Sequence, residues 1–494
     1  MQPMNTIWPW SSPACAISGI RFCKIILMGL IAFAFVFYGA QGTVIQAGQD
    51  IQAAIEKASP GDTILVGPGD YSSFEVDRPV TVLSQGGSSL QAAIQRPAIK
   101  ISSNGVNISG FIIEGIGKDT TAKFNYYMEN RDAAAGARLD LPNAAIIVDG
   151  NDIILQNITV FGAQIGVMAD NADNLSILDS TLDSCDRGAY IAESRMSLVQ
   201  GNTISNCKKY GLDAKRCSGL RVYNNSISGS ANTGFLLKES KKCEVQENVF
   251  STNTFGLALW NSTSNQISKN RADHNYYGIL ITDWSSNNTI EDNIAEENTR
   301  SEIIKGFGIG ISLQENSSHN LVVGNTARKN LNGIDIAKGC KFNAIYGNNI
   351  FDNSNGIRVD KNRNNLIFAN NFERNTASAY DNSSRNIWNT TIGNYYSDYR
   401  GDDENGDGIG DKPYFIPKGD HDEADARPLM DAYRHANLDA AALRGEVEKY
   451  ARFGPDDDEI PSIRMEGRTI AISYHRPSSP PKWSNSKPLD VTRG

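Results

Sequence analysis

The sequence predicts an all-β protein, a right-handed parallel β-helix in which about a dozen coils of 22 or 23 residues stack on one another. The pattern apolar-x-x-Asn-x-apolar recurs from Asn157 to Asn370 in steps of 22 or 23 residues, with one step of 32. An independent glycine series, from Gly166 to Gly356, has the same period and the same single step of 32. Two markers that share a period and an interruption indicate a solenoid rather than several compact domains.

The third observation is a strand pattern that follows each glycine of the series. The residues one and three places after the glycine are apolar in every coil, as in Leu212 and Ala214. Alternation with a period of two is typical of a strand with one buried face, and stacking such strands gives a parallel sheet. The repeated asparagine predicts an inward ladder in which each amide binds its counterpart in the next coil. The glycines are expected at turns that need positive φ.

The chain is expected to begin with an export segment. Residues 1–42 contain Arg21 and Lys24, then an apolar run from Ile25 to Tyr38 that is short for a membrane span. A cleaved signal peptide and an uncleaved N-terminal anchor both fit, and a membrane partner is expected only for the anchor. In both cases the rest of the chain is predicted to be secreted, periplasmic or on the cell surface.

Three further segments follow in the predicted organisation. Residues 43–393 form the β-helix with an N-terminal cap, in which residues 50–58 are a helix. Residues 394–430 form a C-terminal capping module, and residues 431–494 hold a helix at about 437–451 followed by a flexible Pro-rich tail. Two insertions, at 117–143 and near 299–307, interrupt the coils where solenoids tend to carry function.

Charge and cysteine content narrow the partners and the chemistry. Acidic residues outnumber basic ones 56 to 47, which argues against a nucleic-acid binder with a basic face. Cys185 and Cys207 lie 22 residues apart, one coil, so they could form a disulfide in an exported protein. Buried thiols are the alternative for these two and for Cys217, Cys243 and Cys340.

An acidic loop near the C-terminal end predicts a Ca²⁺ site. Oxygen ligands at alternate positions with a glycine at the sixth are what a hard cation requires. The expected ligands are Asp403, Asn405, Asp407, the carbonyl of Ile409, and Asp411. A solvated acidic turn is the alternative, because Tyr414 stands where an EF-hand carries its last glutamate.

These features together resemble the NosD-like family of parallel β-helix proteins over about residues 43–430. The resemblance lies in the cap, the coils, the run from Asn394 to Tyr399, the loop from Gly406 to Asp411, and the closing run from Arg427 to Met430. It implies an exported β-helix of the carbohydrate-binding and sugar-hydrolase type, whose namesake assists copper-site maturation. The five histidines are scattered and form no cluster with soft-metal spacing, so the copper role is not expected to transfer well.

One outer sheet is expected to bind carbohydrate, an acidic polysaccharide in particular. Aromatic rings stack on sugar faces, while lysine and arginine bind carboxylates. The expected substrate-binding residues are Tyr190, Arg216, Lys238, Glu239, Trp260, Asp283 and Trp284. An ordinary solvated sheet face is the alternative.

The run Tyr210-Gly211-Leu212-Asp213 resembles a motif of alginate C5-epimerases, although Ala214 and Lys215 replace the proline and histidine of that motif. This similarity implies a second hypothesis, a polysaccharide lyase or C5-epimerase acting on uronates. Its catalytic residues would be Asp213, Lys215 and Tyr210, with Lys215 as the base. A non-catalytic envelope scaffold or NosD-type maturation factor is a third hypothesis.

Overall fold

The computed structural model describes most of the chain from residue 42 onwards. The described residues are 42–93, 96–115, 143–299, 308–383, 385–390, 392–417 and 424–433, with the backbone of 460–466 and 469–475. The chain divides into two units, residues 1–41 and 42–494, and the second is the subject here. Most of the insertion at 117–143, the loop at 300–307, the helix expected at 437–451 and nearly all of residues 1–42 lie outside the described residues.

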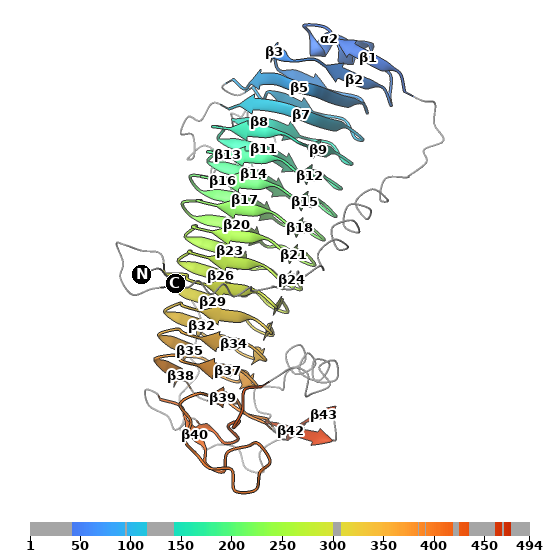
Figure 1. Cartoon of the computed structure of the whole chain (residues 1–494). Coiled ribbons are helices and arrows are strands. Elements are labelled where there is room, and N and C mark those ends of the chain that lie inside the picture. Colours follow the sequence, from blue (N-terminus) through green and yellow to red (C-terminus); the bar gives the residue numbers. More distant parts are fainter. Residues whose placement is uncertain are drawn as a thin grey trace, which may run out of the picture. The chain divides into compact units, whose positions relative to one another are not determined.

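Each coil of the second unit contains three short strands, and each strand pairs in parallel with its equivalent one coil further on (Figure 1). The first strands are β9 (Ile154–Gln156), β12 (Ser176–Leu178), β15 (Leu198–Gln200), β18 (Arg221–Tyr223), β21 (Glu244–Gln246), β24 (Gln266–Ser268), β27 (Thr289–Glu291), β30 (Leu321–Val323), β33 (Ala344–Tyr346) and β36 (Leu366–Phe368). The second strands are β10 (Thr159–Phe161), β13 (Thr181–Asp183), β16 (Thr203–Ser205), β19 (Ser226–Ser228), β22 (Val249–Ser251), β25 (Arg271–Asp273), β28 (Ile294–Glu296), β31 (Thr326–Arg328), β34 (Asn349–Phe351), β37 (Asn371–Glu373) and β39 (Tyr395–Tyr396).

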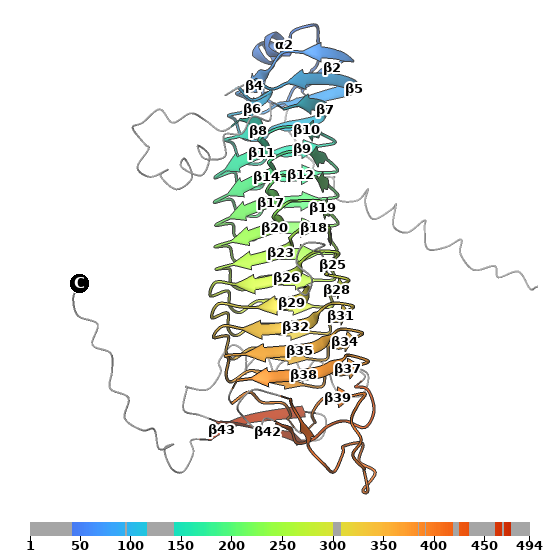
Figure 2. The same cartoon turned by 90° about the vertical axis from the view of Figure 1, so that its left-hand side faces the viewer.

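The third strands form a separate sheet of 13 strands within the described part of the chain, and it faces the viewer in Figure 2. They are β4 (Phe74–Val76), β6 (Ile99–Ile101), β8 (Ala144–Val148), β11 (Ile165–Asp170), β14 (Arg187–Ala192), β17 (Tyr210–Lys215), β20 (Thr233–Lys238), β23 (Phe255–Trp260), β26 (Tyr277–Thr282), β29 (Ile309–Leu313), β32 (Asn332–Ala337), β35 (Asn355–Asp360) and β38 (Ala377–Asn382). A parallel β-helix was predicted, and the fold is a parallel β-solenoid of this kind.

The two ends of the solenoid carry the remaining elements. At the N-terminal end these are β1 (Val44–Ala47), α2 (Ile51–Lys57), β2 (Thr63–Val66), β3 (Gly69–Tyr71), β5 (Thr81–Gln91) and β7 (Asn107–Glu114). At the C-terminal end β40 (Tyr414–Phe415) pairs antiparallel with β41 (Ala424–Asp425). The antiparallel pair β42 (Ile460–Glu466) and β43 (Thr469–His475) was not predicted from the sequence. No helix in the described residues is long and apolar enough to span a membrane.

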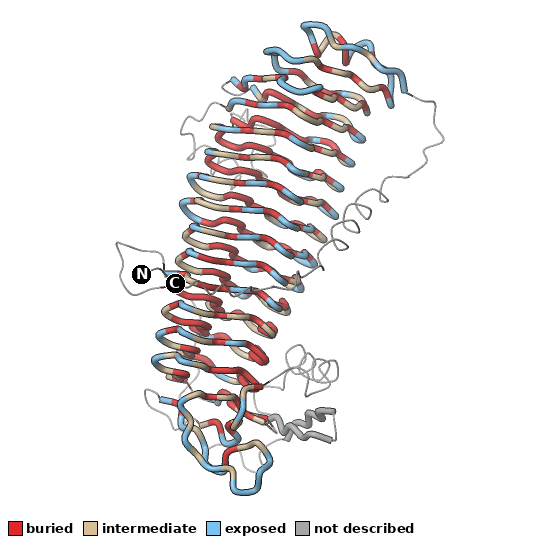
Figure 3. The backbone as a smooth tube through the Cα atoms, viewed as in Figure 1, coloured by how far each residue is buried: buried red, intermediate tan, exposed pale blue. Residues whose placement is uncertain are grey.

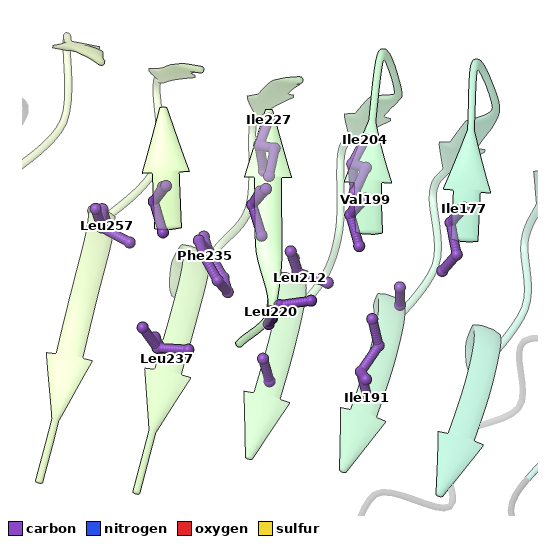
Figure 4. Close-up of a cluster of buried hydrophobic side chains, with 14 of the residues drawn as sticks. Ile177, Ile191, Val199, Ile204, Leu212, Leu220, Ile227, Phe235, Leu237 and Leu257 are labelled. Carbon is purple, nitrogen blue, oxygen red and sulfur yellow. The ribbon is translucent and has the colours of Figure 1, made fainter. Parts of the chain in front are cut away.

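Apolar side chains fill the interior of every coil. Figure 4 shows Ile191, Val199 and Ile204 pointing into the space between strands, and all three are buried. Buried positions recur coil after coil along the tube (Figure 3). The predicted apolar alternation after each glycine is therefore confirmed, because Leu212 and Ala214 belong to this core.

The predicted asparagine ladder is present at the turn between the first and second strands. The backbone N–H and the side-chain Nδ2 of Asn202 both donate to Oδ1 of Asn225, each over 2.9 Å. Asn225 donates in the same way to Asn248 in the next coil. This first ladder satisfies buried polar groups that would otherwise cost about 1–3 kcal/mol each.

Two more ladders occupy the other turns and were not predicted. One comprises Asn253, Asn275, Asn298, Asn330, Asn353 and Asn375. The other comprises Asn265, Asn288, Asn320, Asn343, Asn365 and Asn386. From the coil of Asn253 and Asn265 onwards, all three turns of a coil are thus fixed by amide hydrogen bonds.

The glycine series has a different role from the one expected. Gly188 and Gly211 do not adopt positive φ, which is found at other turn residues such as Asn206 and Arg216. A Cβ on Gly211 would lie 2.5 Å from Cγ2 of Ile227 and 2.6 Å from the carbonyl oxygen of Gly234. Glycine is required here because the third strand enters close to the core and to the next coil.

All five cysteines of the described residues are free, buried thiols. The alternative of buried thiols therefore describes Cys185 and Cys207 in this structure. Burial raises the pKa of Cys185 to about 12. In the two coils before Asn253, the position of this asparagine is held by Ser230 and, one coil earlier, by Cys207. The Cys207 thiol therefore lies inside the stack of coils.

Candidate functional site

Three columns of side chains point outward from the sheet of third strands. The first column holds the residues directly before the series glycines: Arg187, Tyr210, Thr233, Phe255 and Tyr277. The middle column holds Tyr190, Asp213, Leu236, Ala258 and Leu280. The last column holds Ala192, Lys215, Lys238, Trp260 and Thr282. We refer to this surface as the outer face, and most of the predicted site residues lie on it.

A buried ion pair marks the N-terminal end of this face. Nε of Arg187 lies 3.0 Å from Oδ2 of Asp213, and the two side chains are only 6% and 10% exposed. The guanidinium carbon also lies 5.2 Å from the ring centre of Tyr210. Desolvation raises the pKa of Asp213, whereas the Arg187 charge acts in the opposite direction. Asp213 and Tyr210, two of the predicted catalytic residues, are therefore brought together by Arg187.

Lys215 lies at the end of the same strand, in the last column. It forms no ion pair with any described acidic side chain, although its charge lowers the pKa of Asp213. Its neighbours in the sheet are Ala192 and Lys238. Lys215 thus presents a cation at the surface beside the buried Asp213.

Tyr190 lies on the outer face but not at the surface. It is only 3% exposed and packs with Met168 and Ala192 in an apolar cluster. Burial raises the pKa of its phenol above the usual range. In this arrangement neighbouring side chains cover Tyr190, so it presents little surface to a ligand.

The two predicted tryptophans are at the surface. Trp260 is 44% exposed and Trp284 is 65% exposed. Nζ of Lys238 lies 5.1 Å from the ring centre of Trp260, and the indole N–H of Trp260 donates to Asp283. A cation on one side and a carboxylate on the other hold the Trp260 ring in place.

Arg216, Glu239 and Asp283 occupy the turn after the third strand. All three have positive φ, which places them in one stack along the edge of the face. Arg216 forms an ion pair with Glu193 and lies 3.9 Å from Glu239, which in turn lies 3.8 Å from Nζ of Lys238. The charges of this edge are therefore mostly paired with one another.

An aromatic strip on the same face was not predicted. Leu236, Ala258 and Leu280 pack against the half-buried rings of Tyr210, Phe255 and Tyr277. The rings of Phe255 and Tyr277 stack at 5.3 Å, close to one coil step. The signal was present in the sequence, because both aromatic residues directly precede a glycine of the series.

The acidic loop binds its own backbone. The Asp403 carboxylate accepts N–H groups from Gly406, Asp407 and Gly408, and Asp407 accepts one from Ile409. Asp411 accepts the N–H of Glu404, and Asn405 that of Asp407. No group of three or more His, Cys, Asp or Glu side chains in the described residues is arranged to hold a metal ion. The predicted ligands share one loop without converging in this conformation.

A cleft of about 550 Å³ lies apart from the predicted residues, beside Thr299 and Gly308. Lys329, Asp352 and Arg374 line part of it. Arg374 and Asp352 pair over 2.8 Å, and Lys329 pairs with Glu297 over 2.7 Å. Both cations of the described lining are therefore neutralised by acids.

Comparison with known families places the chain. A model described as a right-handed beta helix region matches residues 92–214 and 143–295. The NosD model, described as a periplasmic copper-binding protein, matches residues 236–401. The chain is a NosD-like right-handed β-helix protein. No curated protein matches its sequence.

One solved structure shares the fold of this NosD-like chain, and others align with it at lower scores. The A-module of a mannuronan C-5 epimerase from Azotobacter vinelandii aligns with a TM-score of 0.51 and 11% identity, over 68% of this chain and 92% of the module. The Dettilon tailspike protein aligns with a TM-score of 0.49 and 14% identity, over 71% of this chain and 72% of the tailspike chain. DFA-IIIase from Arthrobacter chlorophenolicus, without its lid, aligns with a TM-score of 0.43 and 15% identity, over 66% of this chain and 94% of the enzyme chain.

The copper named in the NosD description has no fitting ligand set here. His274 lies between Asp273 and Glu297, whereas His319 packs on Phe342 in another coil. The cysteines are buried inside the stack, and their burial raises the pKa of Cys217 and Cys340 to about 12. Soft metals select thiolate, thioether and imidazole ligands. The described residues form no group of three or more His, Cys, Asp or Glu side chains that could hold a metal ion.

Proposed function

We propose that this NosD-like protein binds carbohydrate, an acidic polysaccharide in particular, on the outer face between β17 and β26. The observation that carries the proposal is the exposed Trp260 ring, held by Lys238 and Asp283, two coils from Lys215, which has no ion-pair partner among the described residues. An oriented indole suits the apolar face of a sugar ring, and an unpaired ammonium suits a uronate carboxylate.

The rest of the face supports the same ligand class. Leu236, Ala258 and Leu280 pack against the rings of Tyr210, Phe255 and Tyr277 and give the face an apolar floor. Most edge charges are paired with each other, so a neutral sugar ring can approach without displacing them. The epimerase module that shares the fold acts, by its name, on mannuronan. That likeness supplies only the fold, and the ligand class is inferred from the residues.

Enzymatic action is the second proposal, and it ranks below binding. An epimerase or lyase would need Lys215 as base with Asp213 and Tyr210 beside it. The raised pKa of Asp213 favours a functional carboxyl. The buried pairing with Arg187 argues against it, because the carboxylate is already engaged. The scaffold hypothesis predicts no glycan partner at all.

The location outside the cytoplasm also belongs to this proposal. The signal-like residues 1–42 support export, and the NosD description names a periplasmic protein. A secreted, periplasmic or surface location fits a polysaccharide partner.

We further propose that the two ends of the solenoid are capped. Asp50 caps α2 by accepting the N–H of Ala53, and Ile51, Ala54 and Ile55 of this helix are buried in the core. At the other end the buried Trp388 and Tyr396 belong to the same core. Covering an open parallel edge prevents pairing with another chain.

Calcium binding at residues 403–411 stays a proposal. Gly406 and Gly408 have positive φ and give the tight loop that oxygen ligands require. The side chains would have to exchange their backbone hydrogen bonds for the ion. Its support is therefore the donor set and not a preformed cage.

A glycan array on the protein without residues 1–42 tests the leading proposal. Absorbance of unsaturated uronates on the positive glycans separates binding from lyase action, and product sugar analysis detects epimerisation. Binding without turnover supports the first proposal, and turnover supports the second. An array with no positive glycan would leave only the scaffold hypothesis.

A further inference from the structure

We propose that the carbohydrate is an extended chain lying along the stack of coils, and that a second set of side chains around Arg358 binds it further along the outer face. This inference rests on the proposed function, since it concerns the same face and the same ligand. It adds a binding site, in β35 and β38, that neither the sequence patterns nor the family match assigns.

The second set continues the same columns. Below Leu280 the middle column carries Ser312, Asp335, Arg358 and Tyr380. Asp335 stands at the same repeat position as Asp213, two residues after a series glycine. Both are carboxylates buried on the outer face and paired with an arginine. The apolar residues Leu236, Ala258 and Leu280 lie between these two arginine–aspartate pairs.

Arg358 is held rigidly but stays accessible. Its Nη1 lies 3.2 Å from Oδ1 of Asp335 and its Nη2 lies 3.0 Å from Oδ2 of Asp360, while the side chain remains 37% exposed. Asp335 is nearly covered, and its burial raises its pKa against the pull of the Arg358 charge. A guanidinium clamped by two carboxylates keeps one orientation without further ordering cost.

Unused hydrogen-bonding groups point to a hydroxyl-rich ligand. Nδ2 of Asn355 donates to Oδ1 of Asn332 over 2.8 Å, yet its own Oδ1 has no partner among the described residues. The Nε–H of Arg358 likewise has none there. The half-buried Tyr380 is the register partner of Arg358 in the next coil. An aromatic ring with an amide and a fixed guanidinium matches a sugar ring and its hydroxyl groups.

The distance between Lys215 and Arg358 requires an oligosaccharide of several units. Lys215 in β17 and Arg358 in β35 are separated by six coil steps, about 29 Å at the usual strand spacing. A mono- or disaccharide cannot reach both positions. A longer chain that reaches both gains affinity, because its second contact is intramolecular.

The test is the dependence of affinity on ligand length. Titration calorimetry of the protein without residues 1–42 uses oligouronides from two to about ten units. We expect affinity to rise on the order of tenfold or more once the ligand is long enough to reach both Lys215 and Arg358. Tyr380→Ala should remove this gain and leave the affinity for the shortest ligands unchanged. The double variant Asp335→Asn with Arg358→Gln should do the same, and it leaves no buried charge alone.

Controls separate this inference from the proposed function. Arg374→Ala, an exposed arginine off the outer face, should change affinity at no length. Trp260→Ala should weaken ligands of every length. If affinity does not grow with length, or if both variants with wild-type melting temperatures keep the gain, the second set is overturned while binding at Trp260 stands. If no oligouronide of any length binds, the proposed function and this inference fail together.

Discussion

Oδ2 of Asp425 accepts both the backbone N–H and the side-chain amide of Asn394, over 2.6 and 3.1 Å. This is the contact that an asparagine Oδ1 makes in every earlier coil of the first ladder, from Asn202 to Asn370. Asp425 is fully buried and also accepts the hydroxyl of Tyr396 and the N–H of Arg427. A carboxylate from outside the coils thus ends the ladder.

Asp425 should make stability depend on pH. Desolvation raises the pKa of its carboxyl from 3.8 to about 6 in the folded state. Because the folded pKa is the higher one, its contribution is full below about pH 4 and is lost as pH rises through about 6. The difference corresponds to roughly 3 kcal/mol.

The measurement is the free energy of unfolding of Asp425→Asn relative to wild type between pH 4 and 8. The variant should gain on the wild type as pH rises through this window. Asp352→Asn is the control that should show no pH dependence in this window, because Arg374 lowers the pKa of Asp352 and its carboxylate is ionised in both states above about pH 4. A wild-type and variant difference that stays constant with pH would contradict the assignment for Asp425.

Binding at the outer face should depend on Trp260 and Lys215 in different ways. Trp260→Ala should cost about 1 kcal/mol or more of stacking energy for any bound sugar. Lys215→Ala should weaken anionic ligands more than neutral ones, and added salt should reproduce that loss. If Lys215 is a catalytic base, turnover disappears while binding persists. Equal affinities for wild type, both variants and the control Lys412→Ala would return these residues to a solvated face.

Removing one asparagine from the first ladder should destabilise the solenoid strongly. In Asn270→Ala the N–H and amide of Asn248 lose their acceptor, and the carbonyl of Val245 loses a donor. Leaving such buried groups unsatisfied costs about 1–3 kcal/mol each. Asn232→Ala, at an exposed position, is the matched control. Similar denaturant midpoints for the two variants would show that the ladder adds little to stability.

Two glycines, Gly211 and Gly229, should respond differently to substitution. Gly211→Ala places a methyl against Ile227 and the Gly234 carbonyl, and overpacking of this kind costs about 1–3 kcal/mol. Gly229→Asn should be tolerated, because Asn206 and Thr252 hold the same positive-φ turn in adjacent coils. Thermal melts of both variants decide this, and an unchanged Gly211→Ala would contradict the close approach.

The calcium proposal predicts a shift in melting temperature. An ion that binds only the folded state raises it by mass action. Calcium should stabilise the wild type, and a chelator should reverse the effect, whereas Asp407→Ala should abolish both. Lys412→Ala in the same loop serves as control. A melt that ignores calcium and chelator alike counts against an ion at Asp403, Asp407 and Asp411.

The sequence was enough to predict the coils, because each buried position recurs in every coil and its apolar character can be read many times. The period, the apolar alternation and the first ladder all follow from it. The outer face was harder, because its contacts join different repeat positions in different coils. Arg187 and Asp213 lie 26 residues apart, one coil plus three, and no periodic pattern shows that spacing. The burial of Tyr190 likewise depends on what surrounds it and not on its place in the repeat.

The role of the glycines shows a second limit. A glycine that recurs at a strand start is compatible with a turn of positive φ or with close packing. The sequence alone does not distinguish these two roles. Only the positions of Ile227 and Gly234 decide for close packing. Many of the positive-φ turns carry Asn, Asp, Glu or Lys instead.

The ladder between Asn202 and Asp425 has a direction, since every coil donates towards the C-terminus and accepts from the coil before it. An amide can do both, whereas a carboxylate can only accept. Whole coils can therefore be duplicated or deleted between two asparagines, because each new junction has the same donors and acceptors. Growth beyond Asp425 is chemically closed. Related solenoids should accordingly differ in length by internal coil number and keep a terminal acceptor.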